Sequence, residues 1–593
     1  MISLFKIKDK PEELIQIKQL IDEFKLDEAE LLISDFEQKG RLTFRNLVMC
    51  HLLKCELLFW KGLYKDVVKL AEQTYKESLK LGKNLLSVDI LLRMADGLNW
   101  LGQSDKLHNV IKQGEELLKS LPQEVLTNYK QREASIAWLK GWFYIYKRDA
   151  DQALKQFEHS LVLREEFGSK LGCAYSLAGI GIVFSLVKGD YARALKYYEQ
   201  GITTAEESGN KWCIGFINFR KAELYSFKGN LDQAIMLYKQ VLTIFNEINN
   251  KYMVAWILSY IGEAYRQRGD LDRALECSEQ SLALSHKLGN LRDLAYDHDT
   301  LIHILIDRGD IKRAKQALHD MKLLINQIKD ERGNILYLLN KALILKTNPR
   351  ARNMVEAEEI FKQILENKKS RFGDSSRALI SLCQLLLTEL RMTNDLEVLE
   401  EITLLTDRLL DMAEKSHSYS ILCETYLLQA KLSLLTFDIK KTQRFLTQAQ
   451  QIAERFDLSL LVERIAAEKE DLLTKLDLWE ILKDSEAPMA ERLDLARLDK
   501  RFVGIFYKHT VLIPQFMEEK VVISKEKKIC LVCRGEVFGF SYICKCGANY
   551  CESCAQALTN LENRCWACDV PIDYSKPVKP FKEEVEVDEK PKK

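Results

Sequence analysis

The sequence predicts an all-α protein, a solenoid of stacked helix pairs, followed by a small irregular α+β module built around metal. Three observations lead to this prediction. Short turn motifs recur at a fixed period, proline is nearly absent between residues 12 and 487, and eight of the 15 cysteines fall between residues 530 and 568. Proline breaks helix interiors, so its near absence permits long helices. The glycines of these motifs, such as Gly229 and Gly269, are 40 residues apart, and a fixed period of about 20–50 residues is typical of repeat proteins.

Length and charge restrict the class of protein. The chain has 593 residues, too many for one core, so we expect several domains or a repeat array. Lys+Arg and Asp+Glu both number 87, and this balance predicts neither nucleic acid nor a membrane surface as a partner. Charges interrupt the first residues before any apolar run reaches signal-peptide length. We therefore expect a cytoplasmic protein in which cysteines stay reduced.

The repeat is clearest in four segments that follow one another at equal spacing. They read KGDYARAL from Lys188, KGNLDQAI from Lys228, RGDLDRAL from Arg268 and RGDIKRAK from Arg308. Glycine followed by Asp or Asn suits a tight turn and the N-cap of the next helix. The small alanine five residues after each glycine allows two helices to approach closely. The matching positions are Gly189, Gly229, Gly269 and Gly309, and Ala194, Ala234, Ala274 and Ala314.

Weaker copies extend the array in both directions. Gly62 and Gly102 keep the same period, and each follows a tryptophan, Trp60 or Trp100, by two positions. Later copies drift to a slightly longer spacing. We predict about eleven helix pairs over residues 1–475, followed by a bridging helix and linker over 476–529.

These units resemble the tetratricopeptide repeat (TPR), in its longer form of kinesin light chains and MalT-type regulators. The best match is IGEAYRQRGDLDRALE, where Gly262, Tyr265, Gly269 and Ala274 fall on the family's Gly, aromatic, Gly and Ala positions. The resemblance implies a right-handed superhelix of antiparallel helix pairs with a concave groove for protein or peptide partners.

In that family the first helix of each pair lines the groove. The position after Gly262 forms a column, one member per repeat, with Val183, Glu223, Glu263 and His303, and Arg266 lies one turn from Glu263. We take Glu223, Glu263, Arg266 and His303 as candidate partner contacts. The alternative is an ordinary solvated helix face.

The C-terminal cysteines come in four close pairs between residues 530 and 568. Such pairs supply two tetrahedral sites of four sulfurs each, which predicts two structural zinc ions. A segment this short cannot fold on apolar burial alone, and structural zinc contributes about 10–16 kcal/mol. Disulfides, an iron–sulfur cluster and a nucleic-acid-binding zinc ribbon are the alternatives. The predicted ligands are Cys530, Cys533, Cys544, Cys546, Cys551, Cys554, Cys565 and Cys568.

The module at 530–574 resembles a RING finger, the cross-braced zinc module of many ubiquitin ligases. Tyr550 matches the aromatic residue before the fifth ligand, and Val532, Leu558 and Trp566 match positions that bind the ubiquitin-conjugating enzyme or close the module. In that family the first and third pairs share one metal and the second and fourth the other. Cysteine at the fourth ligand and the wide gap after it depart from most RING fingers, so sequential pairing stays open. Asp569 stands where active ligases often carry a basic residue, which counts against ligase activity and not against the zinc fold.

Two functions follow from this organisation. The first is a non-enzymatic scaffold, whose groove binds a client while the zinc module docks a second protein. The second is a RING-type ubiquitin ligase that acts by positioning a conjugating enzyme, without a nucleophile of its own. A MalT-like regulator is a third possibility, although no DNA-binding segment accompanies the repeats. We predict no catalytic residue, and a disordered charged tail over 575–593.

Overall fold

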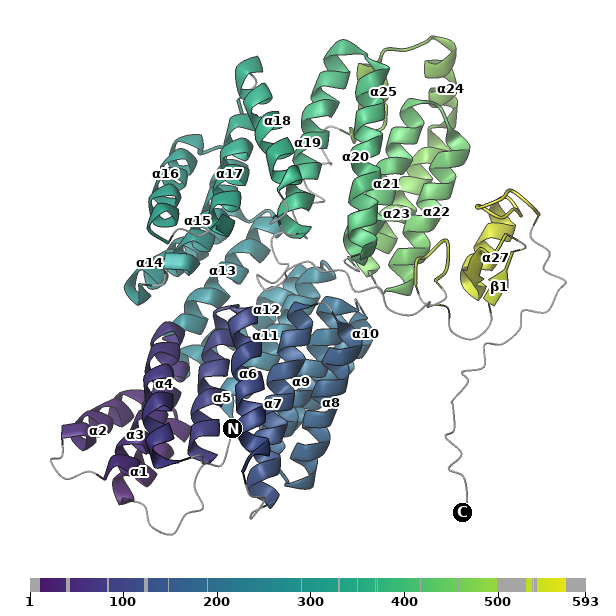
Figure 1. Ribbon diagram of the computed structural model, residues 1–593. Coiled ribbons are helices and arrows are strands. Elements are labelled where there is room, and N and C mark those ends of the chain that lie inside the picture. Colours follow the sequence, from purple (N-terminus) through teal and green to yellow (C-terminus); the bar gives the residue numbers. More distant parts are fainter. Residues whose placement is uncertain are drawn as a thin grey trace, which may run out of the picture. The chain divides into compact units, whose positions relative to one another are not determined.

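The computed structural model describes residues 11–498 and 529–571, apart from 39–42, 83–84, 122–125, 148, 189, 290, 329–330, 349, 368–369, 371, 416–417, 457, 536, 538–540 and 545. The described chain is almost entirely helical, with one two-stranded sheet near its end (Figure 1). The predicted all-α solenoid with a small α+β module is therefore confirmed. The predicted tail at 575–593 and most of the predicted linker lie outside the described residues.

The chain divides into an N-terminal unit, up to Leu382, and a C-terminal unit, from Cys383 onward. The N-terminal unit contains α1 (Glu12–Asp22), α2 (Leu26–Gln38), α3 (Phe44–Trp60), α4 (Tyr64–Ser78), η1 (Leu79–Leu81), α5 (Leu85–Trp100), α6 (Ser104–Lys119), α7 (Leu126–Tyr146), α8 (Ala150–Glu166), α9 (Lys170–Ile182), η2 (Val183–Val187), α10 (Tyr191–Ser208), α11 (Lys211–Phe227), α12 (Leu231–Glu247), α13 (Lys251–Arg268), α14 (Leu271–Leu288), α15 (Leu291–Asp307), α16 (Ile311–Ile328), α17 (Glu331–Lys346), α18 (Ala351–Glu366) and the start of α19 (Phe372–Thr393).

The C-terminal unit contains the rest of α19 and the last repeats. It also contains the head, which we define as residues 529–571. Its elements are α20 (Leu396–Lys415), α21 (Tyr419–Leu435), α22 (Ile439–Arg455), α23 (Ser459–Thr474), α24 (Leu476–Asp484), α25 (Met489–Leu495), β1 (Ser541–Ile543), β2 (Asn549–Cys551) and α27 (Glu552–Leu561). From α1 to α22 the described helices form eleven consecutive pairs.

The predicted turns explain where the helices begin and end. Gly229, Gly269 and Gly309 all have positive φ. So do Gly209, Asn249 and Gly289, a second column at the same spacing in which Asn249 replaces glycine. This left-handed geometry ends one helix, and a polar residue starts the next: Asp270 accepts a hydrogen bond from the backbone N–H of Arg273. Gly189 lies outside the described residues.

The alanines predicted at the helix–helix contacts are fully buried. Ala194, Ala234, Ala274 and Ala314 each have 0% exposure. Each helix packs against the helices before and after it, and alternate helices such as α5 and α7, or α13 and α15, also touch. This is the contact pattern of a helical-repeat array, in which a pair buries its apolar face only against its neighbours.

The N-terminal unit curls until early repeats touch later ones. The rings of Trp60 in α3 and Trp212 in α11 lie 5.3 Å apart, edge to face. The side chain of Asn250 donates a hydrogen bond of 2.8 Å to the backbone carbonyl of Trp60. These contacts join residues that are several repeats apart along the chain, so the concave side of this unit closes on itself.

Glycine at position 62 is required by this closure. Gly62 has a φ of 78°, and a Cβ added there would lie 2.4 Å from the Cβ of Tyr252 in α13. We expect Gly62→Ala to lower the free energy of unfolding by about 2–5 kcal/mol, combining a left-handed cost of about 1–2 with an overpacking cost of about 1–3 kcal/mol. Urea unfolding followed by circular dichroism measures the change.

Gly289→Ala is the matched control for this prediction. Gly289 has a φ of 65°, but no atom lies within 4 Å of an added Cβ. It should therefore show only the backbone cost of about 1–2 kcal/mol. Equal losses for the two variants would contradict the closure of α3 onto α13.

A buried carboxyl makes the N-terminal unit sensitive to pH. Burial raises the pKa of Asp297 in α15 to about 6, although nearby serine hydroxyls favour the charged form. Ser281 donates a hydrogen bond of 3.0 Å to Oδ1, and Oδ2 has no partner among the described residues. Because the folded pKa exceeds the unfolded value of about 3.9, this group stabilises the fold below about pH 4, and the benefit is lost as the pH rises through about 6.

Asp297→Asn should therefore remove a pH-dependent penalty. We expect its stability relative to the wild type to be about 2–3 kcal/mol more favourable at pH 8 than at pH 4, measured by urea unfolding at both values. Asp272→Asn, at a side chain with 88% exposure, is the control and should change stability by less than about 0.5 kcal/mol at either pH. A pH-independent effect of Asp297→Asn would contradict the prediction.

One segment is long and apolar enough to cross a membrane by length and composition. It covers Lys170–Val187, that is, α9 and η2. Within the structure 72% of it is buried. Ala178 and Ile180 in α9 and Val183 in η2 are each at most 1% exposed, which places this segment in the core of the repeats.

Candidate functional sites: two cysteine clusters and an aromatic cavity

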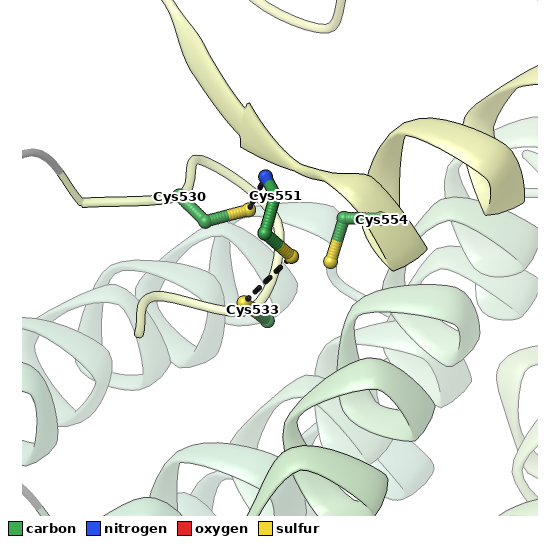
Figure 2. Close-up of side chains that lie close together, drawn as sticks. All are labelled: Cys530, Cys533, Cys551 and Cys554. Carbon is green, nitrogen blue, oxygen red and sulfur yellow. Dashed lines mark hydrogen bonds between the residues drawn. The ribbon is translucent and has the colours of Figure 1, made fainter. Parts of the chain in front are cut away.

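The eight cysteines of the head gather into two clusters of four. Cluster 1 joins the first and third pairs along the chain, and cluster 2 joins the second and fourth. Within each cluster the four sulfur atoms lie within 4.8 Å of one another, and Figure 2 shows the sulfurs of cluster 1 converging. The sequence spacing left both crossed and sequential pairing open, and the structure has the crossed arrangement. Cluster 1 is Cys530, Cys533, Cys551 and Cys554; cluster 2 is Cys544, Cys546, Cys565 and Cys568.

Tight turns bring the two cysteines of each pair together. In three of the four pairs, the residue after the second cysteine has positive φ: Arg534 at 55°, Gly547 at 90° and Asp569 at 58°. Backbone hydrogen bonds close these turns, as when the N–H of Arg534 donates to the carbonyl of Cys530 at 2.9 Å. The remaining pair instead sits at the start of α27, where a helical turn separates its sulfurs.

The spacing of the sulfurs fits a bound metal ion. The distance between sulfurs is 3.7 Å for Cys533 and Cys551 and 3.5 Å for Cys544 and Cys568. A metal with four sulfur ligands at about 2.3 Å would place them about 3.8 Å apart. Both clusters could therefore hold a metal ion. The 15 cysteines are all free thiols, so the alternative of a disulfide-built head receives no support from the structure.

A small sheet and a helix connect the two clusters. Strand β1 pairs antiparallel with β2, with Tyr542 opposite Tyr550. Tyr550 has 0% exposure, and its hydroxyl lies 3.0 Å from the sulfur of Cys565 and accepts a hydrogen bond from the backbone N–H of Trp566. The aromatic residue before Cys551 in cluster 1 thus touches a ligand of cluster 2, which ties the clusters into one module.

The head packs against α22 within the C-terminal unit. Arg444 of α22 donates a hydrogen bond of 2.7 Å through Nε to Glu562, and the sulfur of Cys554 lies 3.4 Å from the side-chain oxygen of Gln451. Arg455, at the end of α22, donates to the sulfur of Cys533 at 3.2 Å. A guanidinium beside these sulfurs favours their thiolate form, the form that binds metal.

The three partner positions predicted in the head have little free surface. Val532 and Leu558 both have 0% exposure, and Trp566 is half-buried, with the Arg444 guanidinium 6.0 Å from its ring. Leu558 is four residues after Cys554 and four before Glu562, both of which contact α22. It therefore shares their face of α27. A role for these residues in binding another protein stays a prediction.

The four partner positions predicted in the repeats are also buried. Glu223 pairs with Arg220 at 2.9 Å, and Glu263 pairs with Arg266 at 2.7 Å. His303 lies beside Arg377 and Asp299. Burial raises the pKa of Glu223 despite the opposing charge of Arg220. These side chains contact other buried side chains of the N-terminal unit, and their role as partner contacts also stays a prediction.

The N-terminal unit contains an aromatic cavity that was not predicted from the sequence. Its volume is about 100 Å³, and it lies between α3, α5, α7, α8, α9 and α11. The one sign of this cavity in the sequence is that Trp60 and Trp100 take the same position in successive repeats. Five of the chain's eight tryptophans line the cavity: Trp60, Trp100, Trp138, Trp142 and Trp212.

The stacked helix pairs and their left-handed turns define a helical-repeat protein of the tetratricopeptide type. The family model for the MalT-like TPR region matches residues 134–462, more than half of the chain. The chain belongs to this family. No curated protein sequence matches it.

Several solved structures resemble the chain in part. A Rap protein complexed with Competence and Sporulation Factor is 16% identical over 68% of this chain and 98% of its own, with a TM-score of 0.42. NprR in complex with its cognate peptide NprX is 14% identical over 60% and 90%, with a TM-score of 0.35. Yeast Tom70 is 17% identical over 70% and 96%, with a TM-score of 0.32. At these scores the likeness carries no conclusion about function.

Proposed function

We propose that this chain is a cytoplasmic protein-interaction scaffold, in which the repeats bind a client protein or peptide and a zinc-built head docks a second protein. One observation carries the proposal: the chain combines a helical-repeat array with a head whose eight cysteines all lie in two clusters that could each hold a metal ion. No thiol of the head is left over for covalent chemistry. Repeat arrays expose extended surfaces that suit proteins better than small substrates.

Zinc is the metal that we propose for both clusters. Four cysteine sulfurs in a tetrahedral arrangement are the usual structural zinc site, and such a site is closed to substrate. The zinc would supply folding energy to a module too small to fold on apolar burial alone. Arg455 and the backbone N–H of Cys551, which donates to the sulfur of Cys530 at 3.3 Å, would offset the negative charge of cluster 1.

The second candidate function is a RING-type ubiquitin ligase. The crossed pairing of the cysteines supports it, because a RING finger crosses its pairs in the same way. The face that would receive a conjugating enzyme includes Leu558, and in this structure that face lies on α22. If the head is a ligase, it is therefore held in a docked state, and release from α22 would expose the binding face.

A ubiquitin-transfer assay separates the two functions. We expect the full chain and its Arg444→Glu variant, which reverses the charge facing Glu562, both to be inactive with a panel of conjugating enzymes. Activity that appears or rises in Arg444→Glu would favour the ligase and overturn the simple scaffold. Arg308→Glu, which breaks an exposed ion pair with Asp272 in the N-terminal unit, is the control and should behave as the wild type.

The scaffold itself is tested by proximity labelling in cells. It predicts two sets of neighbours for the wild-type chain, one of which is lost in Cys551→Ser while the other persists. If one set accounts for all neighbours, or if both disappear together, the two-surface proposal is wrong.

A further inference from the structure

Three residues that line the aromatic cavity carry buried polar atoms without hydrogen-bond partners. Trp142, Tyr175 and Arg220 line it, and the indole Nε1, the tyrosine hydroxyl and the guanidinium Nε of these residues have no hydrogen-bond partner among the described residues. Trp142 and Arg220 are only 7% and 4% exposed. Leaving a buried polar group without a hydrogen-bond partner is unfavourable, so three such groups around one cavity indicate a missing partner.

The chemistry of these groups restricts what that partner can be. An indole N–H and a guanidinium N–H are donors only, and a tyrosine hydroxyl can also donate. The missing partner must therefore be a hydrogen-bond acceptor. A cation or a purely apolar molecule would leave these donors unpaired.

The charge of the cavity favours an anion. Of the three arginines that line it, Arg93 pairs with Asp96 at 3.0 Å and Arg220 pairs with Glu223. Arg164 of α8 is 6% exposed and donates only to the carbonyl of Gly172 and the hydroxyl of Ser176. Among the described residues it has no carboxylate partner. Burial lowers the pKa of Arg164 to about 10, so the guanidinium stays charged at neutral pH.

The aromatic side chains that line the cavity favour an anion that carries an apolar group. The rings of Trp212 and Phe216 stack 5.2 Å apart, and those of Trp138 and Trp142 meet edge to face at 6.0 Å. Trp100, Trp138 and Asp96 keep partial exposure, so a ligand can enter the cavity on their side. A cavity of about 100 Å³ has room for one ring or a branched aliphatic group.

We propose that the aromatic cavity binds a small organic anion, a carboxylate carried on a single aromatic or branched apolar body, with the carboxylate on Arg164 and the unpartnered donors. This inference goes beyond the scaffold function and does not depend on it. The acid can be a free metabolite or the last residue of a peptide, since both present the same group.

Calorimetric titration of the full chain with three ligands of one shape tests the proposal. Phenylacetate should bind with a dissociation constant below about 1 mM. Phenylacetamide, which is neutral, and phenethylamine, which is cationic, should bind at least about tenfold more weakly. Equal binding of the three, or no binding of phenylacetate and of the peptide acid described below, would overturn the proposal. This comparison uses the wild-type chain and needs no variant.

Two variants locate the site. Trp142→Phe keeps the ring and removes the N–H donor, and should weaken phenylacetate binding about fivefold to tenfold. Arg164→Met removes the charge and should weaken it by more than about tenfold while reducing the preference over phenylacetamide. Arg193→Met, at an exposed arginine of α10 with 60% exposure, is the control and should bind as the wild type. Unchanged phenylacetate binding in a folded Trp142→Phe would place the ligand elsewhere and overturn the assignment.

A peptide arm distinguishes the two sources of the acid. Acetyl-Gly-Gly-Phe with a free C-terminus should bind more tightly than phenylacetate if the natural ligand is a peptide end, and more weakly if it is a free acid. The same peptide with an amidated C-terminus should bind at least about tenfold more weakly than the acid form. Equal binding of the acid and amide forms would contradict recognition of the carboxylate.

Discussion

Cys551→Ser should release the metal from both clusters of the head, although Cys551 belongs to one. The crossed arrangement gives the physical reason, because the segment between the two pairs of cluster 1 carries Cys544 and Cys546 of cluster 2. Once cluster 1 opens, this segment is no longer held at its C-terminal end. Structural zinc contributes about 10–16 kcal/mol to such modules, more than their apolar burial can replace.

Metal analysis of the purified chain measures this effect. We expect about two zinc ions per wild-type chain and fewer than about 0.5 per Cys551→Ser chain, with the head becoming sensitive to protease. Helix content should hardly fall, because the head contributes α27 alone to the described helices. A strong chelator should reproduce the protease sensitivity in the wild type.

The matched control is Cys277→Ser. Cys277 is the one cysteine of the described repeats that is not fully buried, and it belongs to neither cluster. Its replacement should leave both ions in place. If Cys551→Ser lost one ion and kept the other, the two clusters would be independent, and the crossed arrangement would not couple their folding.

Local chemistry explains which parts of this structure the sequence could predict. A glycine before Asp or Asn defines a turn within a few positions, so the regular spacing of Gly229, Gly269 and Gly309 located the helix ends. The ligands of the head could also be predicted from local sequence, since only a short segment separates the two cysteines of each pair. Whether the first pair meets the second or the third is a long-range choice, and both choices satisfy the same spacing.

For the same reason the sequence could not show that the column predicted for the groove is buried. The column with Glu223, Glu263 and His303 was assigned to the groove from its place on the first helices. Its burial depends on how far the array curls, which is set by contacts such as Trp60 with Trp212. One part of the buried network was still readable, because Arg220 and Arg266 each lie three residues from their glutamate partners on the same helix. The cavity, by contrast, depends on the curling that brings Trp60 of α3 to Trp212 of α11, and the sequence did not predict that contact.

Asp299→Ala should be the most destabilising single substitution among the buried ion pairs of the N-terminal unit. Arg377 of α19 donates to both oxygens of Asp299 in α15, at 3.0 and 3.3 Å, and Asn340 of α17 donates to Oδ1 at 2.6 Å. All three residues are at most 5% exposed. One carboxylate therefore holds three successive helix pairs together, and alanine removes the acceptor that they share.

The expected loss is about 3–5 kcal/mol in the free energy of unfolding, the usual cost of removing one member of a buried ion pair. Arg377→Met in the same chain should recover part of it, because an apolar side chain costs less there than a charge without its acceptor. Asp232→Ala is the control, since Asp232 is 85% exposed and pairs with Arg268 at the surface. It should lose less than about 1 kcal/mol.

The pH dependence of this loss distinguishes the ion pair from mere packing. Burial alone would raise the pKa of Asp299, but the charge of Arg377 and hydrogen bonds from His303 and Arg377 outweigh it and hold the pKa far below its usual range. A depressed folded pKa contributes stability that is present above the unfolded value of about 3.9 and is lost as the pH falls below it. The gap between the wild type and Asp299→Ala should therefore narrow as urea unfolding is repeated from pH 7 down to about pH 3. A gap that stayed constant over this range would mean that alanine removes packing contacts, and that the charge of Asp299 does not stabilise the junction of α15, α17 and α19.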